Sequence, residues 1–87
     1  MNGWVIKFTP AARRDFRQLS PGPKQAASEI LQDLEEDGPT LVPAMRMRGL
    51  PDTWKARFFN DACRMVYRVA KGQKRILVER IRPRSTA

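Results

Sequence analysis

The chain has 87 residues, a length that predicts one domain over 1–87 with a small core. It contains one Cys and no His, which excludes an internal disulfide framework, a zinc site built from several cysteines and every catalytic arrangement that depends on His. No apolar run approaches the roughly 18 residues of a membrane span, and the N-terminus lacks the pattern of a signal peptide. We therefore expect a cytoplasmic, metal-free protein without a cofactor.

Charge is the strongest signal in the composition. The 17 Lys and Arg, 12 of them Arg, outnumber the 9 Asp and Glu, and the net charge is +8. Residues 1–43 carry a net charge of −1 and residues 44–87 a net charge of +9. Because Arg forks onto phosphate and polyanion binding releases counterions, the second half favours contact with nucleic acid. A solubilising surface and a docking face for an acidic partner protein are the alternatives.

The first half predicts one strand followed by two helices. Residues 3–8 alternate as a short strand. Thr9 and Pro10 then provide the N-cap and the first position of a helix with a narrow apolar stripe. A Pro- and Gly-rich break at 20–23 precedes a second helix over 24–37. The apolar positions of this second helix are Ala27, Ile30, Leu31 and Leu34.

After a Pro-rich connection, the second half changes to the two-residue period of strands. We expect strands at 54–58, 64–69 and 76–81, with turns between them. The last strand is apolar enough to be central in its sheet. The resulting order is β-α-α-β-β-β. It predicts an α+β fold in which two N-terminal helices pack on one face of a small antiparallel sheet.

Strand parity brings basic side chains to one face of this sheet. Lys55 and Arg57 share one face of their strand, and Arg64 and Arg68 share the face opposite Tyr67. If the helices cover the apolar face, these four side chains converge on the open one. Further basic residues extend toward it or lead into it: Arg46, Arg48, Arg80, Arg82 and Arg84. A solvated face would also carry Lys and Arg, but the charge excess favours a phosphate-binding concavity.

Other chemistry-bearing residues form no motif. Cys63 has no His partner, which argues against a catalytic thiol. Asp52, Asp61 and Glu79 are scattered along the chain and predict no divalent-metal cluster. The two Trp residues are better explained as core than as platforms for base stacking.

Two stretches of the second half resemble the RelE branch of the RelE/ParE toxin superfamily. Residues 48–57 read R-G-L-P-D-T-W-K-A-R, and residues 64–69 read R-M-V-Y-R-V. The family's core reads roughly L-R-G-(L/M)-P-D-x-(Y/W)-K-x-(K/R), then Y-R-(L/V)-V-Y. The resemblance extends from Trp4 to Arg84 and implies the RelE-like fold.

The resemblance implies the toxin of a type II toxin–antitoxin pair. RelE-like members are metal-independent endoribonucleases that cut messenger RNA in the ribosomal A site and so inhibit translation. The ribose 2′-OH attacks, and the products carry a 2′,3′-cyclic phosphate and a 5′-OH. A small antitoxin wraps and neutralises the toxin in a hetero-oligomer. Two alternatives stay open: a ParE-like toxin that inhibits DNA gyrase without nuclease activity, and a catalytically weak relative that binds RNA or antitoxin.

The resemblance also implies roles for individual residues. Lys55 matches the Lys that acts as general base or stabilises the activated 2′-OH. Arg64 matches the Arg that stabilises charge on the scissile phosphate, and Arg84 the Arg near the leaving 5′ oxygen. The expected RNA- and phosphate-binding residues are Arg46, Arg48, Arg57, Arg68 and Arg82. Close members carry a Tyr a few residues past the Arg84 position, where this chain has none.

Overall fold

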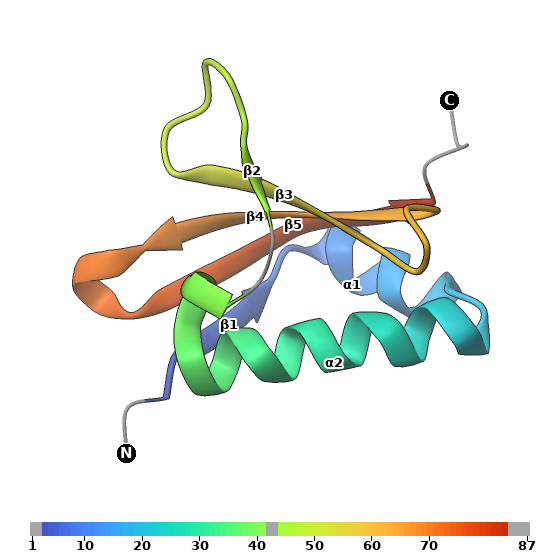
Figure 1. Ribbon diagram of the computed structural model, residues 1–87. Helices are drawn as coiled ribbons and strands as arrows, with labels where there is room; N and C mark the ends of the chain where they lie inside the picture. The colour runs from blue at the N-terminus through green and yellow to red at the C-terminus, as the bar shows by residue number, and fades with distance from the viewer. Residues whose placement is uncertain (1–2, 42–43, 84–87) are drawn as a thin grey trace.

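The computed structural model describes residues 3–41 and 44–83 (Figure 1). The first half forms β1 (Val5–Phe8), α1 (Pro10–Gln18), α2 (Pro21–Asp37) and the 3-10 helix η1 (Gly38–Leu41). The second half forms β2 (Met45–Arg46), β3 (Thr53–Phe58), β4 (Cys63–Ala70), the 3-10 helix η2 (Lys71–Gln73) and β5 (Arg75–Pro83). Figure 1 shows both helices on one side of the sheet, which confirms the predicted α+β fold. The predicted catalytic residue Arg84 lies outside the described residues.

The five strands form one sheet in the order β1-β5-β4-β3-β2. The pairs from β2 to β5 are antiparallel, whereas β1 runs parallel to β5. The sheet therefore differs from the prediction in two ways: it has one more strand, and one of its pairs is parallel. The additional strand β2 has two residues, too few to show a period in the sequence. The two helices carry the chain back across the sheet, which allows β1 to pair in parallel with β5.

The helix ends follow the sequence signals. The Thr9 side chain accepts a hydrogen bond from the Ala12 N–H at 3.0 Å, so Thr9 caps α1 as predicted. Helix α2 begins at Pro21, three residues before the predicted start at 24, because Pro is tolerated in the first turn of a helix. It ends at Asp37 and is capped by Gly38, whose φ of 76° and contact with Trp4 leave no room for a side chain.

A small apolar core lies between the helices and the sheet. Its fully buried members come from both layers: Ala12, Ala27, Leu34, Ala56, Met65, Tyr67, Ile76, Val78 and Ile81. On β4 the buried residues alternate with half-buried or exposed ones, which include Arg64 and Arg68. The parity predicted for β4 is therefore confirmed. The other face of the sheet, which we call the open face, carries the basic residues.

A bulge resets the alternation of β5. Val66 of β4 pairs with Arg80, but its neighbour Tyr67 pairs with Val78, which leaves Glu79 without an opposite residue. Val78 and Ile81 are both buried as a result. Strict alternation from Val78 would have turned Arg80 toward the helices. Because of the bulge, Arg80 and Arg82 instead occupy positions on the open face.

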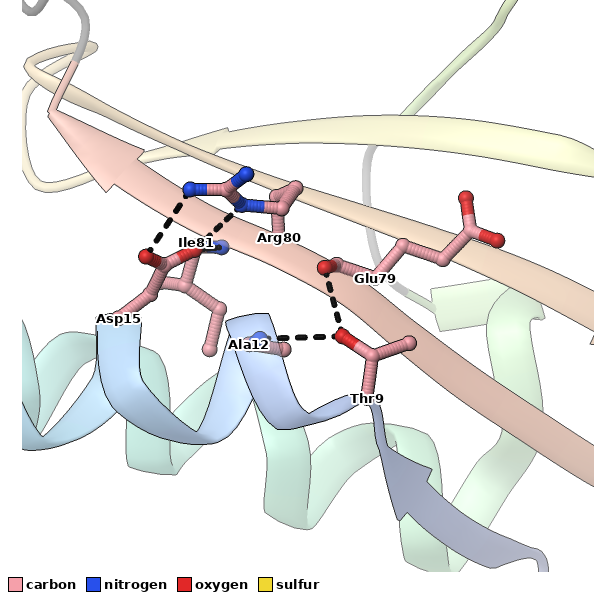
Figure 2. A network of polar contacts seen from close by, with 6 residues as sticks. All are labelled: Thr9, Ala12, Asp15, Glu79, Arg80 and Ile81. Atoms are coloured by element: carbon pink, nitrogen blue, oxygen red, sulfur yellow. Dashed lines mark hydrogen bonds and ion pairs between the residues drawn. The ribbon is translucent and has the colours of Figure 1, made fainter.

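Helix α1 closes the edge of β5 beyond the end of β1 (Figure 2). The Asp15 carboxylate accepts a hydrogen bond from the Ile81 N–H at 3.0 Å and from Arg80 Nε at 2.8 Å. The Thr9 hydroxyl donates to the Glu79 carbonyl oxygen at 2.9 Å. These contacts satisfy backbone groups that an exposed edge would leave unpaired. They also fix β5, and with it Arg82, relative to the helices.

Candidate functional site

Three arginines lie side by side across the open face. In the strand pairing, Arg57 of β3 is opposite Arg64 of β4, and Arg64 is opposite Arg82 of β5. Directly opposite residues share a face, with Cβ atoms about 4.5–5.5 Å apart. We call these three residues the arginine row. Like charges in such positions destabilise a sheet, so the row suggests selection for a function that binds anions.

Lys55 lies next to the arginine row. It pairs with Val66 of β4 on one side and with Met45 of β2 on the other. Its position relative to Arg64 is therefore diagonal, a spacing of about 7–8 Å in antiparallel sheets. Lys55 and Arg64 share the open face, as the parity of their strands predicts. Arg68 occupies the same face, opposite Thr53 and Leu77.

Arg64 is the most constrained member of the row. Its side chain is half-buried, and its Nε atom is buried without a hydrogen-bond partner in the described part of the chain. A charged donor in this state gains more from an added acceptor than an exposed one does. The Nε atom of Arg64 is thus a charged donor that lies below the surface of the open face.

Among the described residues, Asp61 forms an ion pair with Arg57, and Glu79 forms one with Arg68. Arg57 Nε lies 3.6 Å from Asp61 Oδ1, and Arg68 Nη2 lies 3.1 Å from Glu79 Oε2. Exposed ion pairs of this kind contribute about 0–1 kcal/mol, and a polyanion can replace them at little cost. None of the ion pairs between described residues involves Lys55, Arg64 or Arg82. The centre of the open face is therefore strongly cationic.

Three of the basic residues that the sequence placed near this site do not lie beside the arginine row and Lys55. Arg46 pairs with Trp54, which puts it on the helix side of the sheet rather than beside Lys55. Arg48 is exposed in the loop between β2 and β3, where it lines a shallow groove with Leu50 and Pro51. Arg80 is engaged by Asp15 at the sheet edge. No signal in the sequence predicted the pairing of Arg80 with Asp15, because 65 residues separate the two.

The nucleophilic side chains of the core lie on the other side of the sheet. Cys63 is buried, and burial raises the pKa of its thiol, which makes it a poor nucleophile. Burial likewise raises the pKa of Tyr67 to about 12. The described residues hold no group of three or more His, Cys, Asp or Glu that could bind a metal ion. What the open face offers is cationic: it can orient a phosphate and stabilise charge that develops on it.

No helix in the described ranges is long and apolar enough to cross a membrane.

Comparisons with known proteins agree with this fold. A family model described as the ParE toxin of type II toxin–antitoxin systems, parDE, matches residues 6–87. The RelBE2 toxin–antitoxin complex from Mycobacterium tuberculosis matches 95% of the chain and 100% of its own, at 27% identity and a TM-score of 0.74. The archaeal RelE–RelB complex from Pyrococcus horikoshii matches 99% and 100%, at 21% identity and a TM-score of 0.75.

The isolated E. coli RelE toxin is a further match, over 97% of this chain and 87% of that one. Its identity is 20% and its TM-score 0.74. At this identity the likeness establishes the fold, with its two helices against a mostly antiparallel five-stranded sheet. Among curated protein sequences none matches the chain significantly.

Proposed function

The chain belongs to the ParE toxin family of type II toxin–antitoxin systems, in the RelE/ParE superfamily, and we propose that it acts as an endoribonuclease. In this proposal it cleaves messenger RNA in the ribosomal A site without a metal ion and thereby inhibits translation. The proposal also implies that the chain acts in the cytoplasm, where messenger RNA is translated.

The observation that carries the proposal is the arginine row with Lys55 beside it. Three guanidinium groups opposite one another repel, and the buried Nε of Arg64 has no partner within the described ranges. A phosphodiester bound across the row would screen this repulsion and accept hydrogen bonds from the guanidinium groups. A solubilising surface requires neither a half-buried arginine nor this register.

The proposed reaction uses the ribose 2′-OH of the substrate as nucleophile. Lys55, as the neutral amine, takes the 2′-OH proton, and O2′ forms a bond to phosphorus while the bond from phosphorus to O5′ breaks. Arg64 stabilises the charge that grows on the phosphoryl oxygens. The family motif assigns Arg84 to the leaving O5′, which takes a proton from water to give the 5′-OH.

The remaining basic residues bind the RNA strand in this proposal. Arg57, Arg68 and Arg82 hold the phosphates on either side of the scissile one. Arg48 contacts RNA from the β2–β3 loop, and Arg46 adds positive charge at the margin of the sheet. Binding by several cations releases counterions and therefore weakens steeply with salt.

We also propose that a cognate antitoxin neutralises this chain in a hetero-oligomeric complex. The structures from M. tuberculosis and P. horikoshii are of toxin–antitoxin complexes. The +8 net charge of this chain favours an acidic partner. Growth tests this part: expression of the chain alone should arrest cells, and expression of the neighbouring gene with it should restore them.

Inhibition of DNA gyrase is the second candidate function, and one observation favours it: the matching family model is that of ParE toxins. Primer extension on messenger RNA from cells that express the chain distinguishes the two candidates. Cuts within translated codons support the nuclease. Intact message together with gyrase-dependent DNA breaks would replace the nuclease with the gyrase inhibitor.

A further inference from the structure

A second group of basic residues lies at the end of the sheet away from the arginine row. The row lies beside the β3–β4 turn, and Figure 1 shows the β4–β5 turn at the opposite end of the sheet. The start of β1 also lies there, since the Val5 N–H donates to the Lys74 carbonyl oxygen at 2.9 Å. The basic side chains of this end are all exposed, and we call them the turn-end cluster: Lys7, Lys71, Lys74 and Arg75.

Two members of the turn-end cluster lie on the open face. Ile6 packs against the core, so its neighbour Lys7 points to the other side of the sheet. Lys7 pairs with Leu77 of β5, which is also opposite Arg68 on the open face. Arg75 is two residues before Leu77 in the same strand and therefore has the same orientation. The cationic surface of the open face thus continues beyond the residues already described.

The turn-end cluster lies about 20 Å from the arginine row along the strands. Arg75 is opposite Ala70, and six residues of β4 separate Ala70 from Arg64, at about 3.3 Å per residue. Arg68 lies between the two, about 13 Å from Arg64. Its ion pair with Glu79 is partly exposed, and a phosphate can replace it at little cost. Basic side chains therefore follow the strand direction from one end of the open face to the other.

The fold does not neutralise the turn-end cluster. Among the described residues, no ion pair or side-chain hydrogen bond involves any of its four side chains. Three of the four are lysines and none is aromatic, so the cluster offers point charges rather than a platform for base stacking. This composition suits the sugar–phosphate backbone of a nucleic acid, whose charges repeat at regular intervals.

We propose that the turn-end cluster binds the RNA strand at a distance from the scissile phosphate, an inference that rests on the RNA substrate proposed above. A stacked strand rises about 3.4 Å per nucleotide, so about six nucleotides reach from the arginine row to Arg75. The cluster holds the backbone of this distal part and adds affinity without reading sequence. Four cations also attract an acidic protein, but a linear polyanion matches a track that runs from Arg64 through Arg68 to Arg75.

The central test compares two double substitutions that remove the same charge. Lys7→Gln with Arg75→Gln removes two cations of the open face. Arg13→Gln with Arg17→Gln is the matched control, because both arginines are exposed on α1, on the helix side of the sheet. All four positions are exposed, so both variants should keep melting temperatures close to that of the parent.

The probes are single strands of 2′-O-methyl RNA, which lack the 2′-OH nucleophile and cannot be cut in the proposed reaction. Two lengths of about 12 and about three nucleotides are longer and shorter than the span between row and cluster. On the long strand, the Lys7 and Arg75 variant should bind about tenfold more weakly than the parent at low salt. The slope of log K against log salt should fall by about 1.4, at about 0.7 for each lost phosphate contact.

The short strand and the control variant should behave differently. The arginine row alone holds the short strand, so the Lys7 and Arg75 variant should bind it as well as the parent does. The control should match the parent with both strands. Equal losses by the two double variants would overturn the inference, because only net charge would then matter. Equal losses on the long and short strands would also overturn it, because the substituted residues would then act at the row.

The remaining outcomes separate this inference from the proposed function. Unchanged RNA binding with weaker binding of the antitoxin from the neighbouring gene would assign the cluster to a protein partner instead. A parent chain that does not bind the long strand would likewise overturn the inference. Primer extension tests the nuclease independently. Length-dependent binding as expected, with a parent chain that leaves messages intact, would remove the nuclease and leave the RNA-binding track in place.

Discussion

Arg64→Ala separates the chemistry of the open face from the stability of the fold. Removing the central guanidinium removes its charge stabilisation of the phosphate, which should raise the barrier by about 2.7–4 kcal/mol. Cleavage should therefore fall roughly a hundred- to thousandfold. We expect Arg64 to act where charge develops, so the loss should appear as a slower rate at saturating substrate rather than as weaker binding alone.

The same substitution should leave stability nearly unchanged, and the register explains why. Arg64 is opposite both Arg57 and Arg82, and each like-charge pair costs about 0.2–1 kcal/mol. Relief of two such pairs offsets the lost packing of a half-buried side chain. The free energy of unfolding should therefore change by about 1 kcal/mol or less. Added salt should stabilise the parent more than the variant, because salt screens the row.

Two assays on matched samples test this reasoning. Primer extension or a ribosome-programmed cleavage assay gives the rate, and urea unfolding at low and high salt gives the stability. Arg68→Ala is the control for the stability measurement alone, since Arg68 shares the open face but pairs with Thr53 and Leu77 rather than with another arginine. Cleavage by Arg64→Ala at the parent rate would refute its role at the phosphate. A loss of more than about 2 kcal/mol in stability would make Arg64 a structural residue instead.

Three further substitutions test the mechanism and the fold. Lys55→Arg should preserve RNA binding better than the cleavage rate, because guanidinium keeps the charge but gives up a proton far less readily; cleavage at the parent rate would make Lys55 a phosphate anchor. Burial raises the pKa of Asp15, but the hydrogen bonds from Arg80 and Ile81 outweigh it and hold the pKa below its ordinary value. Asp15→Asn should therefore lower the free energy of unfolding by about 1 kcal/mol near pH 7, as measured in urea. The difference from the parent should shrink as pH falls below about 4, because the parent carboxylate then protonates. A difference that does not depend on pH would contradict this account. Gly38→Ala should lower the free energy of unfolding by more than about 2 kcal/mol, since φ is 76° and the new Cβ would lie 2.5 Å from Trp4 Nε1. Gly72→Ala is the control: the space around Gly72 is open, so this substitution should leave the free energy of unfolding nearly unchanged.

Local signals in the sequence predicted most of the elements. The Thr9 and Pro10 pair marked the start of α1, and the strands at 54–58, 64–69 and 76–81 are each observed within two residues of the expected ends. Each of these signals acts over a few residues: a cap, a fixed φ or a period of two. The two-residue strand β2 and the parallel pairing of β1 depend on long-range contacts, and no local pattern encodes them.

The candidate site was predicted in part for the same reason. Parity within β3 and β4 correctly put Lys55, Arg57, Arg64 and Arg68 on one face, because successive side chains of a strand alternate whatever its neighbours are. The alternation within each strand could not predict the register between neighbouring strands. The register that brings Arg57 and Arg64 directly opposite each other comes from the turn between β3 and β4, and it turns a general basic face into a row.

The bulge in β5 shows how much of the site depends on one irregularity. Ile76 and Val78 face the core, so strict alternation would direct Arg80 and Arg82 into it and expose Ile81. The position of Glu79, without an opposite residue in β4, shifts the alternation by one. It makes Ile81 a core residue and brings Arg82 opposite Arg64. Asp15 then secures this arrangement, since its carboxylate accepts from the backbone N–H of Ile81, directly beyond the bulge. The arginine row and the docking of α1 on β5 are therefore two consequences of the same local geometry.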